Sequence, residues 1–286
     1  MSFGSSGMPT TQTRGNAMNY ETILFERDEQ DQFATVTLNR PDKLNSMNGA
    51  LLDELDHAVR SASADPDINA LVLTGAGRAF TTGYDLNSDD FELDVEGWRA
   101  NIGANCARLM TIWNAPIPIV AAVNGYALAG GLELMMCCDL AIAAEDAQLG
   151  EPEVRHASAP PSLMMPWLVP IRHTRYLMYT GDLIDGVEAA RIHLVNKAVP
   201  RDHLMPEVRR LAAKLARMPK PAIKFAKAAL NHQQVAAGLQ SSWDYNLETA
   251  ASLHACDTGR LWMRRLKEMP LKQFLELREK PFRDLD

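Results

Sequence analysis

The sequence predicts a layered α/β fold that ends in a helical carboxy-terminal region. Short strand-like runs alternate with helical patterns from about residue 18 to residue 205. The order strand, helix, strand is typical of a layered α/β core. From about Pro206 onward the pattern is almost wholly helical, and Pro221 suits the first turn of a helix. We therefore expect an α/β core over residues 18–205 and a helical region over residues 206–286.

Four segments are candidates for the strands of this core. Residues 33–38 alternate apolar residues and threonine, as a half-buried strand does. Residues 71–73 and 117–123 are short apolar runs, typical of strands covered on both faces, and residues 140–144 form a fourth candidate. Asn48 can cap a helix between the first two strands. The apolar residues at helical spacing in that helix are Leu51, Leu52, Leu55 and Val59.

The composition is that of an ordinary globular protein. The chain has 286 residues, and a hydrophobic content of 47% allows a large core. Its formal net charge of -7 argues against a general attraction to nucleic acid or anionic membranes, since both require a cationic excess. No apolar run approaches the roughly 20 residues of a membrane span, and we see no secretion signal. Residues 1–17 are rich in Ser, Thr, Gly and Asn, so we expect a disordered tail or a cloning remnant.

The four cysteines show no spacing typical of a metal site or a disulfide framework. No C-x-x-C motif occurs, and adjacent cysteines seldom share a metal or a disulfide. We expect reduced, structural thiols, a cytoplasmic location and no metal. The cysteines are Cys106, Cys137, Cys138 and Cys256.

A glycine-bearing turn follows the predicted strand at residues 71–73. Its Gly75, Gly77 and Gly83 let the backbone turn sharply or approach a ligand closely. The dinucleotide fingerprint G-x-G-x-x-G fails because Phe80 occupies the third glycine position, and no G-K-[ST] ending for a phosphate loop exists. By itself the turn fits a purely structural role as well as a ligand-binding role.

A second glycine-bearing turn lies in residues 123–139, where a strand ends and an apolar helical run begins. Gly130 and Gly131 lie where that helix should start. Free N–H groups at a helix start, with the positive end of the helix dipole, suit a negative charge that develops on oxygen. Glu133 follows in the first turn, where an acidic residue is also favoured for dipole reasons alone.

A second carboxylate of interest lies beyond a further predicted strand. Glu153 follows Glu133 by 20 positions (153 minus 133), and Glu151 beside it has the same chemistry. A surface-loop carboxylate is the simplest interpretation of Glu153, and Glu151 is an equally suitable candidate beside it. The spacing alone therefore does not choose between Glu151 and Glu153.

The two turns and the glutamates belong to a series of short motifs. The series is NRPDKLN at 39–45, GAGRAFTTGYDL at 75–86, NGYALAGGLE at 124–133 and PE at 152–153, with TG at 180–181 and LVN at 194–196. In this order the motifs resemble those of the crotonase superfamily, the enoyl-CoA hydratases and isomerases. The resemblance extends from about residue 19 to the end of the chain.

The resemblance implies a crotonase-like fold of repeated ββα units in a spiral core. It also implies that the carboxy-terminal helices serve trimerisation and active-site cover, in a homotrimer or a hexamer made of two trimers. The implied ligand is an acyl-CoA, with no cofactor beyond its CoA moiety. The implied oxyanion-hole donors are the backbone N–H groups of Tyr84 and Gly130, which leaves the Tyr84 side chain free to shape an acyl pocket. The implied substrate-binding residues are Tyr84, Asp85, Leu86, Asn87 and Gly130.

The pair Glu133 and Glu153 implies an enoyl-CoA hydratase, since family hydratases carry glutamates at both positions. Such a hydro-lyase adds water syn across the 2,3 double bond of an enoyl-CoA thioester through an oxyanion-stabilised enolate. One carboxylate can activate the water for addition at C3 while the other manages the proton delivered to C2. The sequence does not say which is acid and which is base.

Two alternatives to hydration remain open. The nearer one is an isomerase or a hydroxyacyl-CoA dehydratase of the same superfamily with the same oxyanion hole. The other is an RNA-binding or non-catalytic relative, suggested by a basic stretch whose helical spacing is more typical of a solvated face. That stretch contains Arg209, Arg210, Lys214, Arg217, Lys220, Lys224 and Lys227.

The sequence departs from the family pattern in two places. Residues 154–165 lack the family's glycine-rich turn, so Tyr84 and the Met164–Met165 pair suggest a reshaped acyl pocket, although methionines also fill cores. Where relatives often carry a lysine for the CoA phosphates, this chain has Asn87.

Other polar residues have simpler interpretations. Arg40, Lys43 or Arg78 could supply the charge for the CoA phosphates instead, but plain solvation is the simpler interpretation of each. His156 receives no role, because scattered histidines are most often surface residues or residues with satisfied hydrogen bonds.

Overall fold

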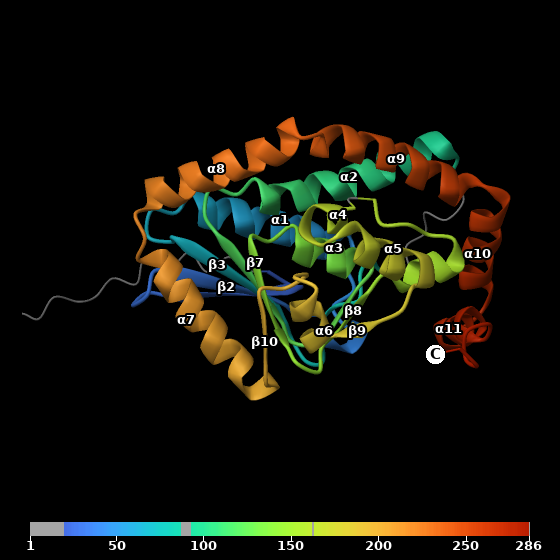
Figure 1. Cartoon of the computed structure of the whole chain (residues 1–286), viewed down its shortest axis with the longest axis horizontal. Coiled ribbons are helices and arrows are strands. Elements are labelled where there is room, and N and C mark those ends of the chain that lie inside the picture. The colour runs from blue at the N-terminus through green and yellow to red at the C-terminus, as the bar shows by residue number, and fades with distance from the viewer. Residues whose placement is uncertain (1–19, 87–92, 162, 286) are drawn as a thin grey trace, which may run out of the picture.

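The computed structural model describes residues 20–86, 93–161 and 163–285. The expected tail at residues 1–17 and the predicted substrate-binding residue Asn87 lie outside these ranges. In the described part, two β-sheets carry helices on their outer faces, and further helices follow in the carboxy-terminal region (Figure 1).

The larger sheet has six strands and is mostly parallel. Only the pair at one edge, β1 with β2, is antiparallel. All four strands expected from the sequence lie in this sheet. The interpretation of residues 71–73 and 117–123 as covered strands is confirmed, whereas the interpretation of residues 33–38 as a half-buried strand was wrong, because both faces of β2 are buried. In spatial order its strands are β1 (Ile23–Asp28), β2 (Phe33–Leu38), β3 (Ala70–Gly75), β5 (Ile119–Val123), β7 (Leu140–Ala144) and β10 (Lys197–Val199).

The smaller sheet contains the second strand of three successive units, together with β9. After β3, β5 and β7 the chain turns and adds a short strand to the other sheet, then enters a helix. This repetition confirms the predicted ββα units. In spatial order the strands are β4 (Ala79–Thr81), β6 (Tyr126–Leu128), β8 (Gln148–Gly150) and β9 (Ile184–Asp185).

Helices follow the strand pairs of the core. The first helix, α1, begins after Asn48, whose side-chain oxygen accepts a hydrogen bond of 3.0 Å from the Leu51 N–H. This cap was expected from the sequence. The α-helices of the core are α1 (Gly49–Ala64), α2 (Val95–Trp113), α3 (Gly130–Met136), α4 (Met165–Leu168), α5 (Ile171–Thr180) and α6 (Gly186–Arg191). The 3-10 helices are η1 (Pro41–Lys43), η2 (Pro152–His156) and η3 (Arg201–His203).

Close backbone packing holds the turns that connect the two sheets. A Cβ atom on Gly75 would lie 2.1 Å from the Ala79 carbonyl oxygen, so only glycine fits. The buried Asn45 donates hydrogen bonds to the carbonyls of Ala79 (2.8 Å) and Ala76 (2.9 Å). Asn45 therefore clamps the chain between β3 and β4, just before the turn that carries Tyr84.

Five helices form the carboxy-terminal region. In Figure 1, α7 crosses one face of the larger sheet, while α8 and α9 run along the opposite side above α1 and α2. The helix α8 is tied to the core by Lys227, which is buried and lies 2.7 Å from the Asp139 carboxylate. The helices are α7 (Leu204–Ala216), α8 (Lys220–Ala236), α9 (Leu239–Ala255), α10 (Asp257–Glu268) and α11 (Leu271–Glu279).

Among the helices of residues 20–86, 93–161 and 163–285, none combines the length and the apolar character that crossing a membrane requires.

Candidate active site

Two backbone N–H groups lie unengaged at neighbouring turns. Met47 donates a hydrogen bond to the Gly83 carbonyl (2.8 Å) and accepts one from the Asp85 N–H (2.9 Å), so the N–H of Tyr84 between them points away. Gly130 opens α3, where the first N–H groups have no partner within the helix. No group in the described part of the chain accepts a hydrogen bond from the N–H of Tyr84 or Gly130.

Glycines bring these two N–H groups together. Gly83 has a φ of +92°, and a Cβ atom there would lie 3.0 Å from the Gly130 nitrogen. A Cβ atom on Gly131 would lie 2.3 Å from the Thr81 carbonyl oxygen. The start of α3 therefore packs directly on β4 and on the turn that carries Tyr84.

The Tyr84 ring covers the start of α3. A Cβ atom on Gly130 would lie 2.5 Å from the ring carbon Cε2 of Tyr84. The Tyr84 hydroxyl is buried and has no hydrogen-bond partner among the residues described. Burial, with the neighbouring carboxyl group of Glu133, raises the pKa of Tyr84 well above its ordinary value. Tyr84 therefore contributes two groups: its unengaged backbone N–H, and a neutral phenol next to Glu133.

An ion pair holds the other end of the same turn. The Arg40 guanidinium lies 2.9 Å from the Asp85 carboxylate, and both side chains are mostly buried. The interpretation of Arg40 as a merely solvated cation was wrong. Lys43 and Arg78, the other two candidates for the CoA phosphates, are exposed, and Leu86 is half-buried where the described segment ends.

Glu133 lies in the first turn of α3 and is completely buried. It faces α2 as well as Tyr84, since burial and the charge of Glu133 raise the pKa of Cys106 to about 12. A helix dipole alone favours an acidic residue on the surface of a first turn, where water solvates it. Complete burial costs a carboxylate much more than the dipole returns, so the dipole does not explain this position.

Glu153 and Glu151 are both buried, at the start of η2. Glu153 is 8% exposed and Glu151 is 0% exposed, so the interpretation of Glu153 as a surface-loop carboxylate was wrong. Burial raises the pKa of Glu153 to about 7, against the opposing effects of a hydrogen bond with Glu151 and the charge of Arg278. Burial and the carboxyl groups of Glu153 and Glu133 raise the pKa of Glu151 well above its ordinary value. The fold therefore gathers three carboxyl groups.

The carboxy-terminal helices hold η2 in place. The side chain of Arg155 is buried and forms ion pairs with Asp182 (2.6 Å) and Glu279 (2.5 Å). Its guanidinium carbon lies 4.2 Å from the centre of the Phe282 ring. Arg278, which influences the pKa of Glu153, also comes from α11. Sequence reasoning missed Arg155 and Arg278, since 124 positions separate Arg155 from Glu279 and no local motif marks such a contact.

His156 differs from the expectation, whereas the methionines agree with one of their two interpretations, that of core residues. His156 is buried against Phe274, with ring centres 5.3 Å apart, and its Nδ1 atom has no partner among the described residues. Burial lowers its pKa to about 3, so the description of His156 as a surface or satisfied residue was wrong. Met164 and Met165 are 1% and 0% exposed and belong to the main hydrophobic core.

The arrangement suits a reaction in which an oxygen atom becomes negative while protons move nearby. Two preorganised N–H donors can stabilise an oxyanion, which is often the largest single contribution to catalysis. Carboxyl groups with pKa values near neutrality can give and accept protons at physiological pH. Burial keeps water from screening both effects.

The chain is similar to known enoyl-CoA hydratases and isomerases in both sequence and structure. A family model described as enoyl-CoA hydratase/isomerase matches residues 28–284. The chain is 34% identical to a crotonyl-CoA hydratase from Syntrophomonas wolfei, over 93% of this chain and 99% of the relative. It is 31% identical to a short-chain-enoyl-CoA hydratase from Clostridium acetobutylicum, over 92% and 97% of the two chains. A crystal structure of an enoyl-CoA hydratase/isomerase from Xanthobacter autotrophicus superimposes with a TM-score of 0.87 at 30% identity, over 92% of this chain and 99% of that one.

Proposed function

Because the chain belongs to the enoyl-CoA hydratase/isomerase family, we propose that it adds water across the 2,3 double bond of an enoyl-CoA thioester with Glu133 and Glu153 as its acid–base pair. The enzyme is a hydro-lyase, an enoyl-CoA hydratase. One observation above all supports the proposed site. Glu133 is buried in the first turn of the helix that Gly130 opens, Glu153 is buried as well, and the backbone N–H groups of Tyr84 and Gly130 are unengaged.

The proposed reaction begins at the thioester carbonyl. Its oxygen accepts hydrogen bonds from the N–H groups of Tyr84 and Gly130, which stabilise the negative charge of the enolate. Removing one donor of this kind typically costs about 2.7 to 4 kcal/mol of transition-state stabilisation. The proposed substrate-binding residues Asp85 and Leu86 follow Tyr84 directly in the chain.

Two carboxyl groups then divide one water molecule. A carboxylate takes a proton from the water as the water oxygen bonds to C3, and the electrons of the double bond move to the thioester oxygen. When the enolate collapses, the other carboxyl group gives a proton to C2. The product gains one OH and one H, and the two glutamates exchange protonation states. A pKa of about 7 keeps both forms of Glu153 populated near neutral pH.

The loss of absorbance of enoyl-CoA thioesters tests this function. We expect turnover of crotonyl-CoA, since one relative is named for that substrate and another for short-chain substrates. Longer, branched and aryl enoyl-CoA thioesters in the same assay define the acyl specificity. A 3-enoyl-CoA and a hydroxyacyl-CoA in parallel distinguish the isomerase and dehydratase alternatives. Absence of turnover of every 2-enoyl-CoA would overturn the proposal.

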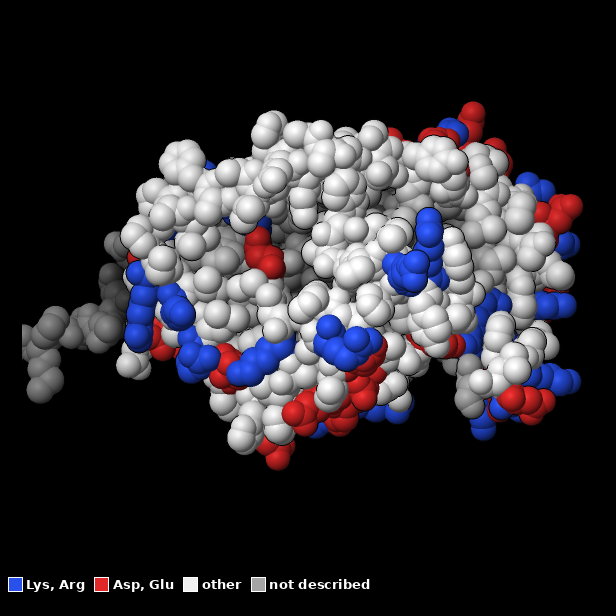
Figure 2. Space-filling model, viewed as in Figure 1, with Lys and Arg blue, Asp and Glu red and all other residues white. Residues whose placement is uncertain are grey.

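The proposed assembly is a homotrimer or a hexamer. Large apolar side chains are exposed on α8 and α9: Phe225 (72%), Leu230 (63%) and Tyr245 (73%). In Figure 2 the upper surface, where Figure 1 places these helices, is largely free of charged residues. Such apolar surfaces mark contacts between chains. We expect sedimentation at the mass of three or six chains, reduced to one chain by F225E combined with L230E. A wild-type monomer at micromolar concentration would contradict the assembly.

The proposal includes the location and the cofactor requirement. The chemistry above needs no metal and no cofactor beyond the CoA moiety of the substrate. The proposed cytoplasmic location is supported by the cysteines, all of which are free thiols. Cell fractionation checks this location.

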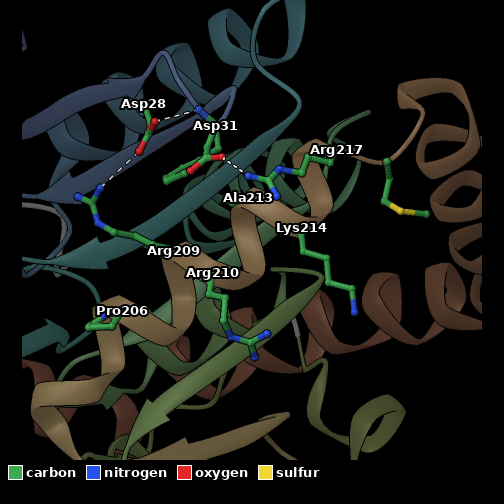
Figure 3. Close-up of a pocket in the computed structure, with 10 residues that line it drawn as sticks. Asp28, Asp31, Pro206, Arg209, Arg210, Ala213, Lys214 and Arg217 are labelled. Carbon is green, nitrogen blue, oxygen red and sulfur yellow. Dashed lines mark hydrogen bonds and ion pairs between the residues drawn. The ribbon is translucent and has the colours of Figure 1, made fainter.

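The basic stretch on α7 and α8 gives RNA binding no support. Its residues on α7 line a surface groove of about 720 Å³ beside the β1–β2 turn (Figure 3). There Arg217 lies 2.9 Å from Asp31 and Arg209 lies 3.8 Å from Asp28. Three further cations of the stretch are engaged elsewhere, since Arg210 pairs with Glu207, Lys227 pairs with Asp139, and Lys220 donates to two carbonyls. Five of the seven cations of the stretch are therefore engaged within the chain, which leaves few of them to bind phosphates.

A further inference from the structure

Glu151 has an environment that does not suit a carboxylate. It connects β8 to η2, and the residue is 0% exposed. Both of its carboxyl oxygens are enclosed, and no N–H or hydroxyl group of the described residues donates a hydrogen bond to either of them. A charge buried without donors is strongly unfavourable, and a carboxyl group in such a position takes up a proton instead.

The neighbours of Glu151 include a group that can accept a hydrogen bond from that proton. The carboxyl group of Glu153 lies within hydrogen-bonding reach. Two carboxylates accept hydrogen bonds but cannot donate them, so this contact requires a proton on one of the two. A shared proton also removes the repulsion between two adjacent negative charges.

The surrounding charges assign the proton to Glu151. From α3, the nearby Glu133 disfavours a negative charge on Glu151. From α11, Arg278 favours a negative charge on Glu153, although Arg278 also pairs with Glu279 (2.5 Å). The remaining cation of η2, Arg155, is already engaged by Asp182 and Glu279, and it donates to the Thr180 carbonyl at the end of α5. The asymmetry of charge therefore leaves Glu153 as the ionised partner.

We propose that Glu151 is a positioning residue of the hydration site, with a protonated carboxyl group that donates a hydrogen bond to the carboxylate of Glu153. The inference deepens the proposed function and rests on it for its catalytic consequence. The pair then carries one negative charge rather than two. The hydrogen bond orients the Glu153 carboxylate and offsets part of the effect of burial, which would otherwise favour protonated Glu153 more strongly.

The protonation state can be measured without any turnover. We would label the glutamate carboxyl carbons with ¹³C and record NMR spectra of the wild type and of E151Q near neutral pH. The resonance that disappears in E151Q is expected at the position of a protonated carboxyl group. The variant E29Q serves as the control. Glu29 is exposed, so its substitution should remove a resonance at the position of a carboxylate. If the resonance lost in E151Q belongs to a carboxylate, the inference is wrong.

The kinetic consequence separates a hydrogen-bond donor from a space filler. E151Q keeps an N–H donor, so we expect kcat within about threefold of wild type. E151M keeps the volume but removes the donor, so the pKa of Glu153 rises. In the pH profile of kcat/KM, the limb that reports the titration of Glu153 should then shift to higher pH by about one unit or more. We also expect kcat to fall roughly tenfold or more, with little change in KM.

The two proposals fail in different ways. If E151M and E151Q both retain the wild-type pH profile, Glu151 does not position Glu153, although hydration stands. If the wild type hydrates no enoyl-CoA, the proposed function fails, and the NMR measurement still decides whether Glu151 holds the proton.

Discussion

E133Q and E153Q should each lower kcat for crotonyl-CoA hydration by roughly 10²- to 10⁴-fold, the usual contribution of a positioned acid or base. An amide has nearly the shape of a carboxyl group but neither accepts a proton from water nor donates one to carbon. Because the amide preserves packing around these buried positions, we expect KM to change much less than kcat. The measurement is steady-state kinetics of the loss of enoyl absorbance, with thermal unfolding of each variant.

Two controls accompany this result. E145Q alters an exposed glutamate between the two sites in sequence and should leave kcat unchanged. The double variant E133Q/E153Q should lower kcat by much less than the product of the single effects, because in the proposed mechanism the two groups act on one water molecule. If either single variant keeps wild-type kcat, the two-carboxylate mechanism is wrong.

Stability provides an independent check on Glu153. Its pKa is raised from 4.5 to about 7 in the folded protein, so the folded state binds the proton more tightly than the unfolded chain. The contribution of Glu153 to the free energy of unfolding is fully present below about pH 4.5, and it is lost as the pH rises through 7. Relative to wild type, E153Q should therefore become more stable as the pH increases from 5 to 8. Chemical denaturation across that range measures the difference.

G131A should disrupt the proposed oxyanion hole by displacing the start of α3. The added Cβ atom would lie 2.3 Å from the carbonyl oxygen and 2.9 Å from the carbonyl carbon of Thr81, so α3 must move away from β4. This movement separates the N–H groups of Gly130 and Tyr84. We expect kcat/KM to fall by roughly 10²- to 10³-fold, as after loss of an oxyanion donor. Overpacking should also lower the free energy of unfolding by about 1 to 3 kcal/mol.

The matched control for this variant is G49A. Gly49 begins α1, and a Cβ atom there meets no other atom within 4 Å. G49A adds the same methyl group to the first turn of another helix and should leave both activity and stability close to wild type. Wild-type kcat/KM in G131A would show that the close contact between α3 and β4 does not determine the position of the donors.

Local sequence signals identified much of the core. The alternating pattern of residues 33–38 and the apolar run of residues 140–144 became β2 and β7, with the expected bounds. Asn48 caps α1 as expected, because capping involves only neighbouring residues. The glycines around Tyr84 and Gly130 were also visible, since a backbone that approaches another backbone closely excludes side chains.

The three carboxyl groups show what local signals could not decide. Glu151 and Glu153 have the same chemistry and lie two positions apart, so only their burial and their neighbours assign them different properties. Those neighbours come from α3 and α11, which are far away in the sequence. The pKa of a carboxyl group depends on the solvent and charges around it in three dimensions.

The sequence by itself determined the α/β class, the position of the glycine turns and the candidate pair Glu133 and Glu153. Only the tertiary structure decided that Glu151 joins that pair, that Arg40 holds the turn after Tyr84, and that α11 packs on η2 through Arg155. Strands, caps and tight turns depend on residues a few positions apart. Burial, ion pairs and proton affinities depend on which distant segments the folded chain brings into contact.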